Sequence, residues 1–288
     1  MRMLLGAHMS IAGGFARAAE RGRAATCTAI QLFTKNNMQW RARPLAAGAG
    51  REFQAACRAQ GIEAAFGHTS YLINLGAVAR QTARRSVASL GDEIRRAQRL
   101  GLPFLVLHPG NHMGSGEAAG LRRVADRLGE ALDVTADSGV QIALETTAGQ
   151  GTSLGYSFEH LAFLIETTAM PERLGVCFDT AHLFAAGYDI RTPAGCRRCV
   201  GELLGMVGRD RLLAVHLNDS KAELGSRVDR HEHIGGGRIG LGAFWQLMND
   251  RRLRRVPMVL ETPKGTGAAR DLANLARLRS LVGRPQPA

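Results

Sequence analysis

The sequence predicts an α/β fold, a single (β/α)₈ TIM barrel domain over residues 1–288. Two observations lead to this prediction: eight short apolar runs alternate with helix-like stretches, and each run stops near a polar residue. In such a barrel the carboxyl ends of the strands meet on one face, which carries the chemistry. The apolar runs are residues 3–7, 29–33, 64–67, 104–107, 141–144, 175–178, 212–215 and 257–260.

Apolar residues at helical spacing predict the helices between these runs. Residues 81–100 carry one such stripe, and residues 117–138 carry another that Gly139 would end. Ser157 is a candidate N-cap for a further helix, and Leu272 opens the last stripe. We expect these faces to pack on the sheet rather than to bind a cofactor.

Length and composition limit the class of protein. A chain of 288 residues with 45% hydrophobic residues fits one large domain with a sizeable core. No apolar run approaches the roughly 20 residues that a membrane span needs. Residues 1–8 are too short and too soon polar for a signal peptide. We therefore expect a cytoplasmic protein with no membrane partner.

The five cysteines are an odd number, which argues against a disulfide framework. Cys196 and Cys199 have the spacing of a redox or metal-binding pair. They follow Thr192 and Pro193, which are typical of the cap and first residue of a helix. No second pair of this spacing completes a structural zinc site, so we interpret both as small helical residues.

The chain is strongly basic, with 37 Lys and Arg against 25 Asp and Glu and a formal net charge of +12. Such a balance favours a polyanionic partner, nucleic acid first. Nearly all of the cations are Arg, because only Lys35, Lys221 and Lys264 are lysines. Since the chain is also rich in Ala and Gly, genome composition is a second explanation of the Arg excess.

Six of the eight runs stop at residues that are candidate metal ligands. A lone His or carboxylate at a strand end is most often a structural hydrogen-bonding or capping residue. Six such residues at one end of a barrel need another explanation, because unpaired buried carboxylates repel one another and are costly to desolvate. A divalent cation resolves that conflict, so we predict a metal site at the carboxyl ends of the strands. The six residues are His68, His108, Glu145, Asp179, His216 and Glu261.

Two further pairs enlarge the candidate set. Asp179 and His182 lie one helical turn apart, and Asp229 and His231 would point to one side of an extended segment. The resulting nine ligands are too many for one ion and suit two or three ions with one bridging carboxylate. Since no thiolate is among them, a catalytic zinc or manganese site is favoured over a closed structural one.

The charge of such a site indicates its substrate. Three divalent ions bring six positive charges and the four carboxylates bring four negative ones, so the site stays positive. This suits a phosphodiester, whose negative charge concentrates on the reacting group, and a metal cluster also supplies hydroxide at neutral pH. Neither a Ser-His-Asp arrangement nor a reactive Cys is required.

Nine stretches, in order and spread over nearly the whole chain, match one known family. They are GAHMSIAGG (6–14), LFTKN (32–36), SYLINLG (70–76), HPG (108–110), ETTAGQG (145–151), CFDTAH (177–182), HLND (216–219), GSRVDRH (225–231) and LET (260–262). On these stretches the chain resembles the endonuclease IV family, the metal-dependent apurinic/apyrimidinic endonucleases of base-excision repair. The resemblance implies three zinc ions per chain, for which manganese could substitute.

The resemblance also implies a catalytic scheme in which Glu145 and Glu261 are catalytic. A metal-bridging hydroxide would attack the phosphorus 5′ to an abasic sugar, and the third zinc would stabilise the departing 3′ oxygen. The products would be a 3′-hydroxyl and a 5′-deoxyribose phosphate, and cleaning of blocked 3′ ends is expected from the same site. The implied zinc groups are His68, His108 and Glu145; Glu145 (bridging), Asp179, His216 and Glu261; and His182, Asp229 and His231.

Recognition of the lesion is implied for the loops after the second and third strands. The first loop departs from the family, which places Gln and then Arg where this chain has Asn37 and Met38. Met38 can still wedge between bases, but it supplies no cation, so we expect weaker phosphate steering, offset by Arg41 or Arg43. The implied DNA contacts are Asn36, Met38, Gln39, Tyr71, Leu72 and Arg230; without the resemblance, Tyr71 and Leu72 would be interpreted as packing residues.

The leading interpretation is an abasic-site endonuclease, acting as a nucleoid-associated monomer on double-stranded DNA that holds abasic sites or blocked 3′ ends. A sugar isomerase or epimerase is the alternative, because those related barrels also carry metal-binding residues at strand ends. The nine ligands, the basic charge and the two loops favour the nuclease. A catalytically silent DNA-damage binder is disfavoured because every expected ligand is present.

Overall fold

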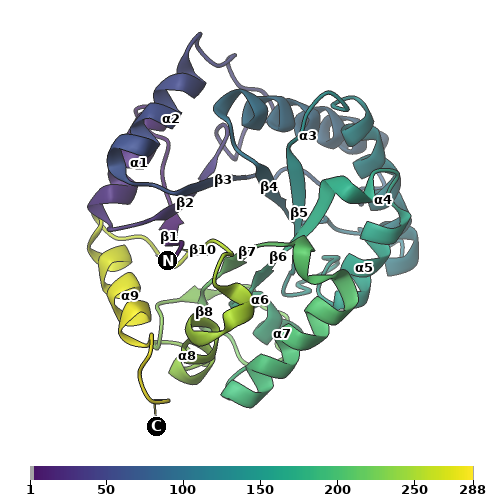
Figure 1. Ribbon diagram of the computed structural model, residues 1–288. Helices are drawn as coiled ribbons and strands as arrows, with labels where there is room; N and C mark the ends of the chain where they lie inside the picture. The colour runs from purple at the N-terminus through teal and green to yellow at the C-terminus, as the bar shows by residue number, and fades with distance from the viewer. Residues whose placement is uncertain (1–2, 288) are drawn as a thin grey trace.

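The computed structural model describes residues 3–287. Its centre is a closed barrel of eight parallel strands with helices on the outside (Figure 1), in the order β1, β10, β7, β6, β5, β4, β3 and β2. This arrangement confirms the predicted fold class. The barrel strands are β1 (Leu5–His8), β2 (Ala29–Phe33), β3 (Ala64–His68), β4 (Phe104–Leu107), β5 (Gln141–Glu145), β6 (Leu174–Asp179), β7 (Leu212–His216) and β10 (Met258–Leu260).

Helices connect the strands and form the outer ring of Figure 1. Short 3₁₀ turns, η1 (Pro171–Arg173), η2 (Arg209–Arg211) and η3 (Arg251–Leu253), precede β6, β7 and β10. The α-helices are α1 (Phe15–Ala24), α2 (Ala49–Gln60), α3 (Arg80–Leu100), α4 (Glu117–Asp133), α5 (Phe158–Thr167), α6 (Thr180–Ala186), α7 (Pro193–Val207), α8 (Leu241–Asn249) and α9 (Ala269–Ser280).

The two-residue period of the strands sets which side chains point into the barrel. Phe66 and Phe104 stack inside it with ring centroids 4.7 Å apart. The buried inner cluster also includes the residue two positions before each of the six strand-end ligands, so each ligand faces the same interior as its apolar neighbour. These inner residues are Phe66, Val106, Ala143, Cys177, Ala214 and Val259.

The helices bury apolar faces against the outside of the barrel, as their spacing predicts. Val87, Leu90 and Ile94 of α3 are all buried in one large outer cluster. The prediction for the last helix is wrong at one residue, because Leu272 of α9 is 36% exposed while Leu275 is buried.

The helix predicted over residues 117–138 ends earlier than expected. α4 stops at Asp133, and the chain turns through the following residues before Gly139. The buried Thr135 hydroxyl donates to the carbonyl oxygen of Ala131 at 2.8 Å, which caps this end. A side chain therefore ends the helix, where the sequence indicates a glycine.

The segment 218–242 is ordered by a pair of very short strands and one carboxylate. β8 (Asp219–Ser220) pairs antiparallel with β9 (His231–Glu232). The Asp219 carboxylate accepts hydrogen bonds from the backbone N–H groups of Gly235, Gly237 and Ile239 at 2.9–3.1 Å. These hydrogen bonds hold the glycine-rich turn 235–237 against β8 and fix β9, the strand that carries His231.

The cysteine pair lies in a helix, as its sequence context predicts. Thr192 accepts a hydrogen bond from the Gly195 N–H at 3.0 Å, and Pro193 is the first residue of α7. Cys196 and Cys199 are buried free thiols. Burial raises the pKa of the Cys196 thiol to about 12, which leaves it unreactive at neutral pH.

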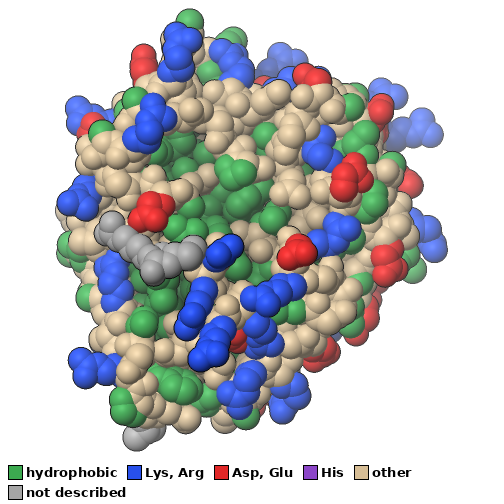
Figure 2. Space-filling view, viewed as in Figure 1, with side chains coloured by type: hydrophobic (Ala, Val, Ile, Leu, Met, Phe, Trp, Pro, Cys, Tyr) green, Lys and Arg blue, Asp and Glu red, His purple; other side chains and the backbone are tan. Residues whose placement is uncertain are grey.

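Basic side chains cluster at the starts of two barrel strands, opposite the ends that carry the candidate metal ligands. Figure 2 shows Lys and Arg side chains gathered near α7 and α8, beside an apolar hollow. A cleft of about 630 Å³ between the starts of β7 and β10 is lined by Arg209, Arg251, Arg254 and Arg255. Within residues 3–287, none of the helices has the length and apolar composition to cross a membrane.

Candidate metal centre

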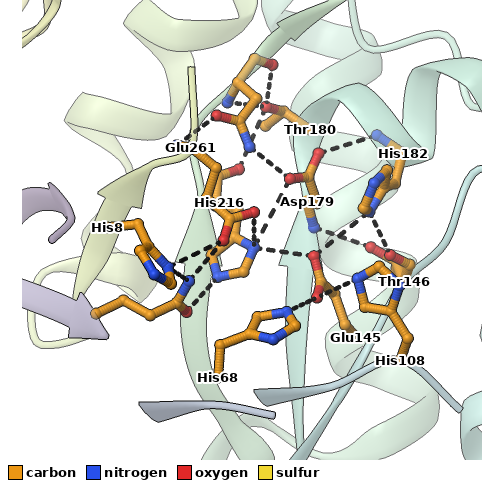
Figure 3. Close-up of polar contacts among 12 residues, drawn as sticks. His8, His68, His108, Glu145, Thr146, Asp179, Thr180, His182, His216 and Glu261 are labelled. Atoms are coloured by element: carbon orange, nitrogen blue, oxygen red, sulfur yellow. Dashed lines mark hydrogen bonds and ion pairs between the residues drawn. The ribbon is translucent and has the colours of Figure 1, made fainter. Parts of the chain in front are cut away.

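Six polar side chains converge where the barrel strands end (Figure 3). His68, Glu145 and His216 are the last residues of β3, β5 and β7. His108 and Glu261 follow directly after β4 and β10, and Asp179 ends β6. The barrel thus brings together residues from six separate parts of the sequence, as the alternation of strands and helices predicts.

Glu145 lies at the centre of this group and is fully buried. Its Oε2 atom lies 3.2 Å from His68 Nε2 and 2.9 Å from His108 Nε2, and its Oε1 atom lies 2.9 Å from His216 Nδ1. Burial raises the pKa of Glu145, but His108 and His216 outweigh it and hold that pKa well below its usual range. The carboxylate is therefore ionised at neutral pH.

A second group surrounds His216. Its Nδ1 atom lies 3.2 Å from Glu261 Oε2 and 3.7 Å from Asp179 Oδ2. Burial raises the pKa of Glu261, but the charge and hydrogen bond of His216 outweigh it, and the pKa stays well below its usual range. Candidate ligand atoms of Glu145, Asp179, His216 and Glu261 all lie within 4.8 Å of one another.

A third group joins α6 to the segment 218–242, which carries Asp229 and His231. His182 Nε2 lies 3.2 Å from Asp229 Oδ2, and His231 Nε2 lies 3.4 Å from Asp229 Oδ1. Burial raises the pKa of Asp229, but the hydrogen bond from His182 outweighs it and lowers the pKa to about 2. Asp179 also lies within 4.8 Å of ligand atoms of His182 and His231, so it stands between the second and third groups.

The donor set fits divalent metal ions. All nine residues offer imidazole nitrogen or carboxylate oxygen, a set typical of catalytic zinc or manganese rather than of a closed thiolate site. Among the buried side-chain nitrogens and oxygens of residues 3–287, only His231 Nε2 lacks a hydrogen-bond partner. That atom faces two carboxylates, which is the position of a metal ligand.

Backbone carbonyls orient the histidines. The Nδ1 atom of His68 lies 2.7 Å from the carbonyl oxygen of Thr69, and the Nδ1 atom of His182 lies 2.8 Å from that of Thr146. Each Nδ1–H donates to its carbonyl, which leaves Nε2 free to face the centre. Such partners fix the tautomer of a metal-binding histidine.

Gln31 is a buried member of the site that the sequence analysis missed. Its Nε2 atom donates to Glu261 Oε1 at 2.6 Å, and its Oε1 atom accepts from His216 Nε2 at 2.8 Å. His8 lies beside it, with Nδ1 2.9 Å from the Gln31 amide nitrogen. The signal was present, since Gln31 is the one polar side chain inside an apolar strand.

Asn218 braces the opposite side and was also missed as a site residue. Its side-chain amide donates to Asp179 Oδ2 at 2.6 Å, and its side-chain carbonyl oxygen accepts from the Glu261 backbone N–H at 2.8 Å. It therefore orients one ligand from β6 and one from the end of β10.

The remaining histidines lie outside the three groups. His160 is buried, because its ring packs on Tyr156 at 4.8 Å and its Nδ1 accepts from the Gly155 N–H. His233 is half-buried and accepts from Asn274 at 2.9 Å. His112 accepts from the Gly116 N–H, an interaction that stabilises its own loop.

The residues expected to contact DNA lie at the rim of the site. Tyr71 is 54% exposed, and its ring lies 5.4 Å from that of His68 and 5.9 Å from that of His108. Met38 is 67% exposed. Leu72 is half-buried, whereas Asn36, Gln39 and Arg230 are exposed.

The fold and the candidate site define a class of (β/α)₈ barrel with His and carboxylate side chains at its strand ends, and known proteins share this fold. The family model of xylose isomerase-like TIM barrels matches residues 15–280. D-psicose 3-epimerase from Clostridium cellulolyticum shares the fold, with a TM-score of 0.65 and 14% identity over 97% of this chain and 95% of that one.

Two relatives are much more similar. The probable endonuclease 4 of Chloroflexus aurantiacus is 50% identical over 277 residues, which cover 96% of this chain and 97% of the relative. The crystal structure of endonuclease IV from Thermus thermophilus matches with a TM-score of 0.85 and 38% identity, over 96% of this chain and 98% of that one. The chain belongs to the endonuclease IV family, which confirms the resemblance seen in its motifs.

Proposed function

We propose that this protein is a DNA-repair endonuclease that uses three zinc ions to hydrolyse the phosphodiester 5′ to an abasic site. The observation that carries the proposal is the set of three linked His–carboxylate groups at the carboxyl ends of the barrel strands. Glu145 and Asp179 each belong to two of these groups. A single-metal site has no use for so many ionised ligands at one place.

The nine candidate ligands can be divided among three ions. His68 and His108 would hold one ion with Glu145, and Glu145 would also help Asp179, His216 and Glu261 to hold a second ion. His182, Asp229 and His231 would hold the third, with Asp179 as a further neighbour. When bound, the metals activate water and polarise the phosphoryl oxygens. Manganese could replace zinc, because the donor set accepts both.

The side chains of the chain itself supply anchoring and exclusion of water. With pKa values well below the usual range, the carboxylates of Glu145 and Glu261 stay anionic and act as anchors rather than as proton acceptors. Tyr71 lies over His68 and His108 and would shield the scissile phosphate from bulk water. Arg230 is exposed beside Asp229 and would contact a phosphate of the bound strand.

The exposed apolar side chains at the rim suit a bent duplex. Enzymes that act on extrahelical nucleotides fill the gap in the base stack with inserted side chains. Met38 and Tyr71 are large, apolar or aromatic, and exposed on neighbouring loops. We propose that they insert beside the abasic site, with Asn36, Gln39 and Leu72 contacting the flanking nucleotides.

The products would be a 3′-hydroxyl and a 5′-deoxyribose phosphate, and the same centre would remove blocking groups from 3′ ends. We propose that the protein acts as a monomer in the cytoplasm, on the nucleoid. The alternative of a sugar isomerase or epimerase rests on fold alone, since those neighbours are 14–20% identical in sequence to this chain.

One comparison separates the two functions. Zinc-loaded protein is incubated with an abasic duplex, with the matched intact duplex and with a panel of ketohexoses. Nicking of the abasic duplex alone, lost in Glu145→Ala and Glu261→Ala, is the expected result, and binding to the abasic duplex should survive in those variants. Glu130→Gln, an exposed carboxylate on α4, is the control. Turnover of a sugar without nicking would overturn the proposal.

A further inference from the structure

A face of α3 holds charged side chains beneath both rim loops, which we name the first loop (residues 34–43) and the second loop (residues 68–76). Ser89, Glu93 and Arg96 lie one and two helical turns apart, and all three are buried. Charged residues are rarely buried in a helix unless they are paired. None of the three belongs to the metal groups.

The carboxylate of Glu93 touches both loops and is fully buried. Its Oε2 atom accepts from the Thr34 hydroxyl of the first loop at 3.1 Å. Its Oε1 atom accepts from the Ser70 backbone N–H of the second loop at 3.1 Å and lies 3.6 Å from Lys35 Nζ. One side chain thus ties the starts of two segments that are far apart in sequence.

Lys35 forms an ion pair with Glu93 and is also buried, with 3% of its surface exposed. Its ammonium donates to the Ser89 hydroxyl at 2.8 Å and to the carbonyl oxygen of Trp40 at 3.1 Å. It therefore draws the far part of the first loop back to α3. The guanidinium of Arg96 donates to the carbonyl oxygens of Thr34 and Arg43, which holds both ends of the same loop.

The loops also touch each other directly. The Ser70 hydroxyl donates to the carbonyl oxygen of Asn37 at 2.6 Å. Asn37 precedes Met38, and Ser70 precedes Tyr71, so this bond ties the side chain before Tyr71 to the backbone before Met38. The Met38 N–H is itself held by Asn36 Oδ1 at 2.9 Å.

Burial of this ion pair has a cost, because both groups lose their hydration. Burial raises the pKa of Glu93, and Lys35 together with the bonds from Ser70 and Thr34 opposes that rise. Two apolar side chains would pack equally well at these positions. They could not, however, hydrogen-bond to both loops at once and so hold the loops at a fixed distance from each other.

We propose that the Lys35–Glu93 pair is a positioning device that couples the two loops, so that Met38 and Tyr71 enter damaged DNA as one preformed unit. This rests on the proposed function, because it assigns the insertion step to the coupled loops. A unit that is already ordered loses less entropy on binding than two loops that move independently. Glu93 acts through the loops and does not touch the reacting atoms.

The test compares Glu93→Gln with wild type in three assays on zinc-loaded protein. Hydrolysis of bis(4-nitrophenyl) phosphate reports the metal centre and should stay unchanged. The KM for an abasic duplex should rise about tenfold, the loss expected for one hydrogen bond to a charged group. Asp92→Asn is the control, because it removes a charge near Lys35 from a half-exposed residue that bonds neither loop backbone.

The third assay is decisive and measures the abasic-duplex affinity of Met38→Ala, Tyr71→Ala and the double variant. When Glu93 is present, the double variant should bind about three- to tenfold tighter than two independent losses of affinity predict. In the Glu93→Gln background the two losses should simply multiply. Should Glu93→Gln fail to fold, Ser70→Ala removes the direct bond between the loops and should weaken the coupling in the same direction.

The possible failures are distinguishable. If wild type neither binds nor nicks the abasic duplex in preference to an intact one, the proposed function is wrong and the inference falls with it. If wild type nicks the abasic duplex but the coupling is the same in Glu93→Gln and Ser70→Ala as in wild type, only the positioning device is refuted.

Discussion

Replacing Gln31 by Met tests how far the metal centre depends on residues that do not bind the metal. Gln31 is fully buried, and both ends of its amide are used, by Glu261 Oε1 at 2.6 Å and by His216 Nε2 at 2.8 Å. Methionine keeps the length of the side chain but offers neither bond. We expect the variant to fold and to lose metal affinity and activity.

The size of the effect follows from the two lost bonds. A buried imidazole N–H left without an acceptor costs about 1–3 kcal/mol. Loss of a partner that orients a metal ligand typically lowers metal affinity or activity about 10- to 100-fold. Since a factor of ten corresponds to about 1.4 kcal/mol, the two figures agree.

The assay measures zinc affinity by competition with a chelating dye, and kcat on an abasic duplex. Gln141→Met is the matched control, because Gln141 starts β5 at the opposite end of the barrel and its side chain bonds the carbonyl of Glu172. Zinc affinity and kcat equal to wild type in Gln31→Met would refute the reasoning.

Three further predictions concern the loops and the metals. Met38→Arg should raise abasic-duplex affinity and steepen its dependence on salt by about one unit of logarithmic slope; an unchanged affinity at low salt would refute the role given to this position. Asp219→Asn weakens the hold on the segment that carries Asp229 and His231, so mass spectrometry should find about one zinc fewer per chain, whereas a full complement would count against it. Burial lowers the pKa of His182, but Asp179 and Asp229 outweigh it and place that pKa well above its usual range. Metal-free protein therefore holds a proton there at neutral pH, so zinc uptake should release protons and weaken as the pH falls, which calorimetry in two buffers would detect.

The barrel and the strand-end ligands could be predicted because both depend on local sequence. An apolar run of four or five residues followed by His or a carboxylate marks a strand and its carboxyl end without knowledge of the rest of the chain. Closure of the barrel then places Glu145 against His68 and His216. The pairing of Asp229 with His182 could be predicted only from the family motifs, because the segment that carries Asp229 shows no regular spacing of apolar residues.

The contacts of the supporting residues could not be predicted, because their partners are distant in sequence, although Gln31 stands out as the one polar side chain of its strand. Gln31 bonds a glutamate 230 positions away. Glu93 lies in the middle of an amphipathic helix, where a charged residue normally faces solvent, and its burial follows from the paths of two loops. The end of α4 was misplaced for a related reason, since Thr135 caps the helix with a side chain that sequence spacing does not distinguish from a helical residue.

The most direct test of the account is the position and chemistry of the break in DNA. A labelled duplex with one tetrahydrofuran abasic analogue is incubated with zinc-loaded protein and with chelator-treated protein, and the products are resolved by size and end group. Because the analogue cannot undergo β-elimination, a nick must arise by hydrolysis. The account predicts a single zinc-dependent nick 5′ to the lesion with a 3′-hydroxyl end. An intact duplex after incubation with protein that holds three zinc ions per chain would contradict it.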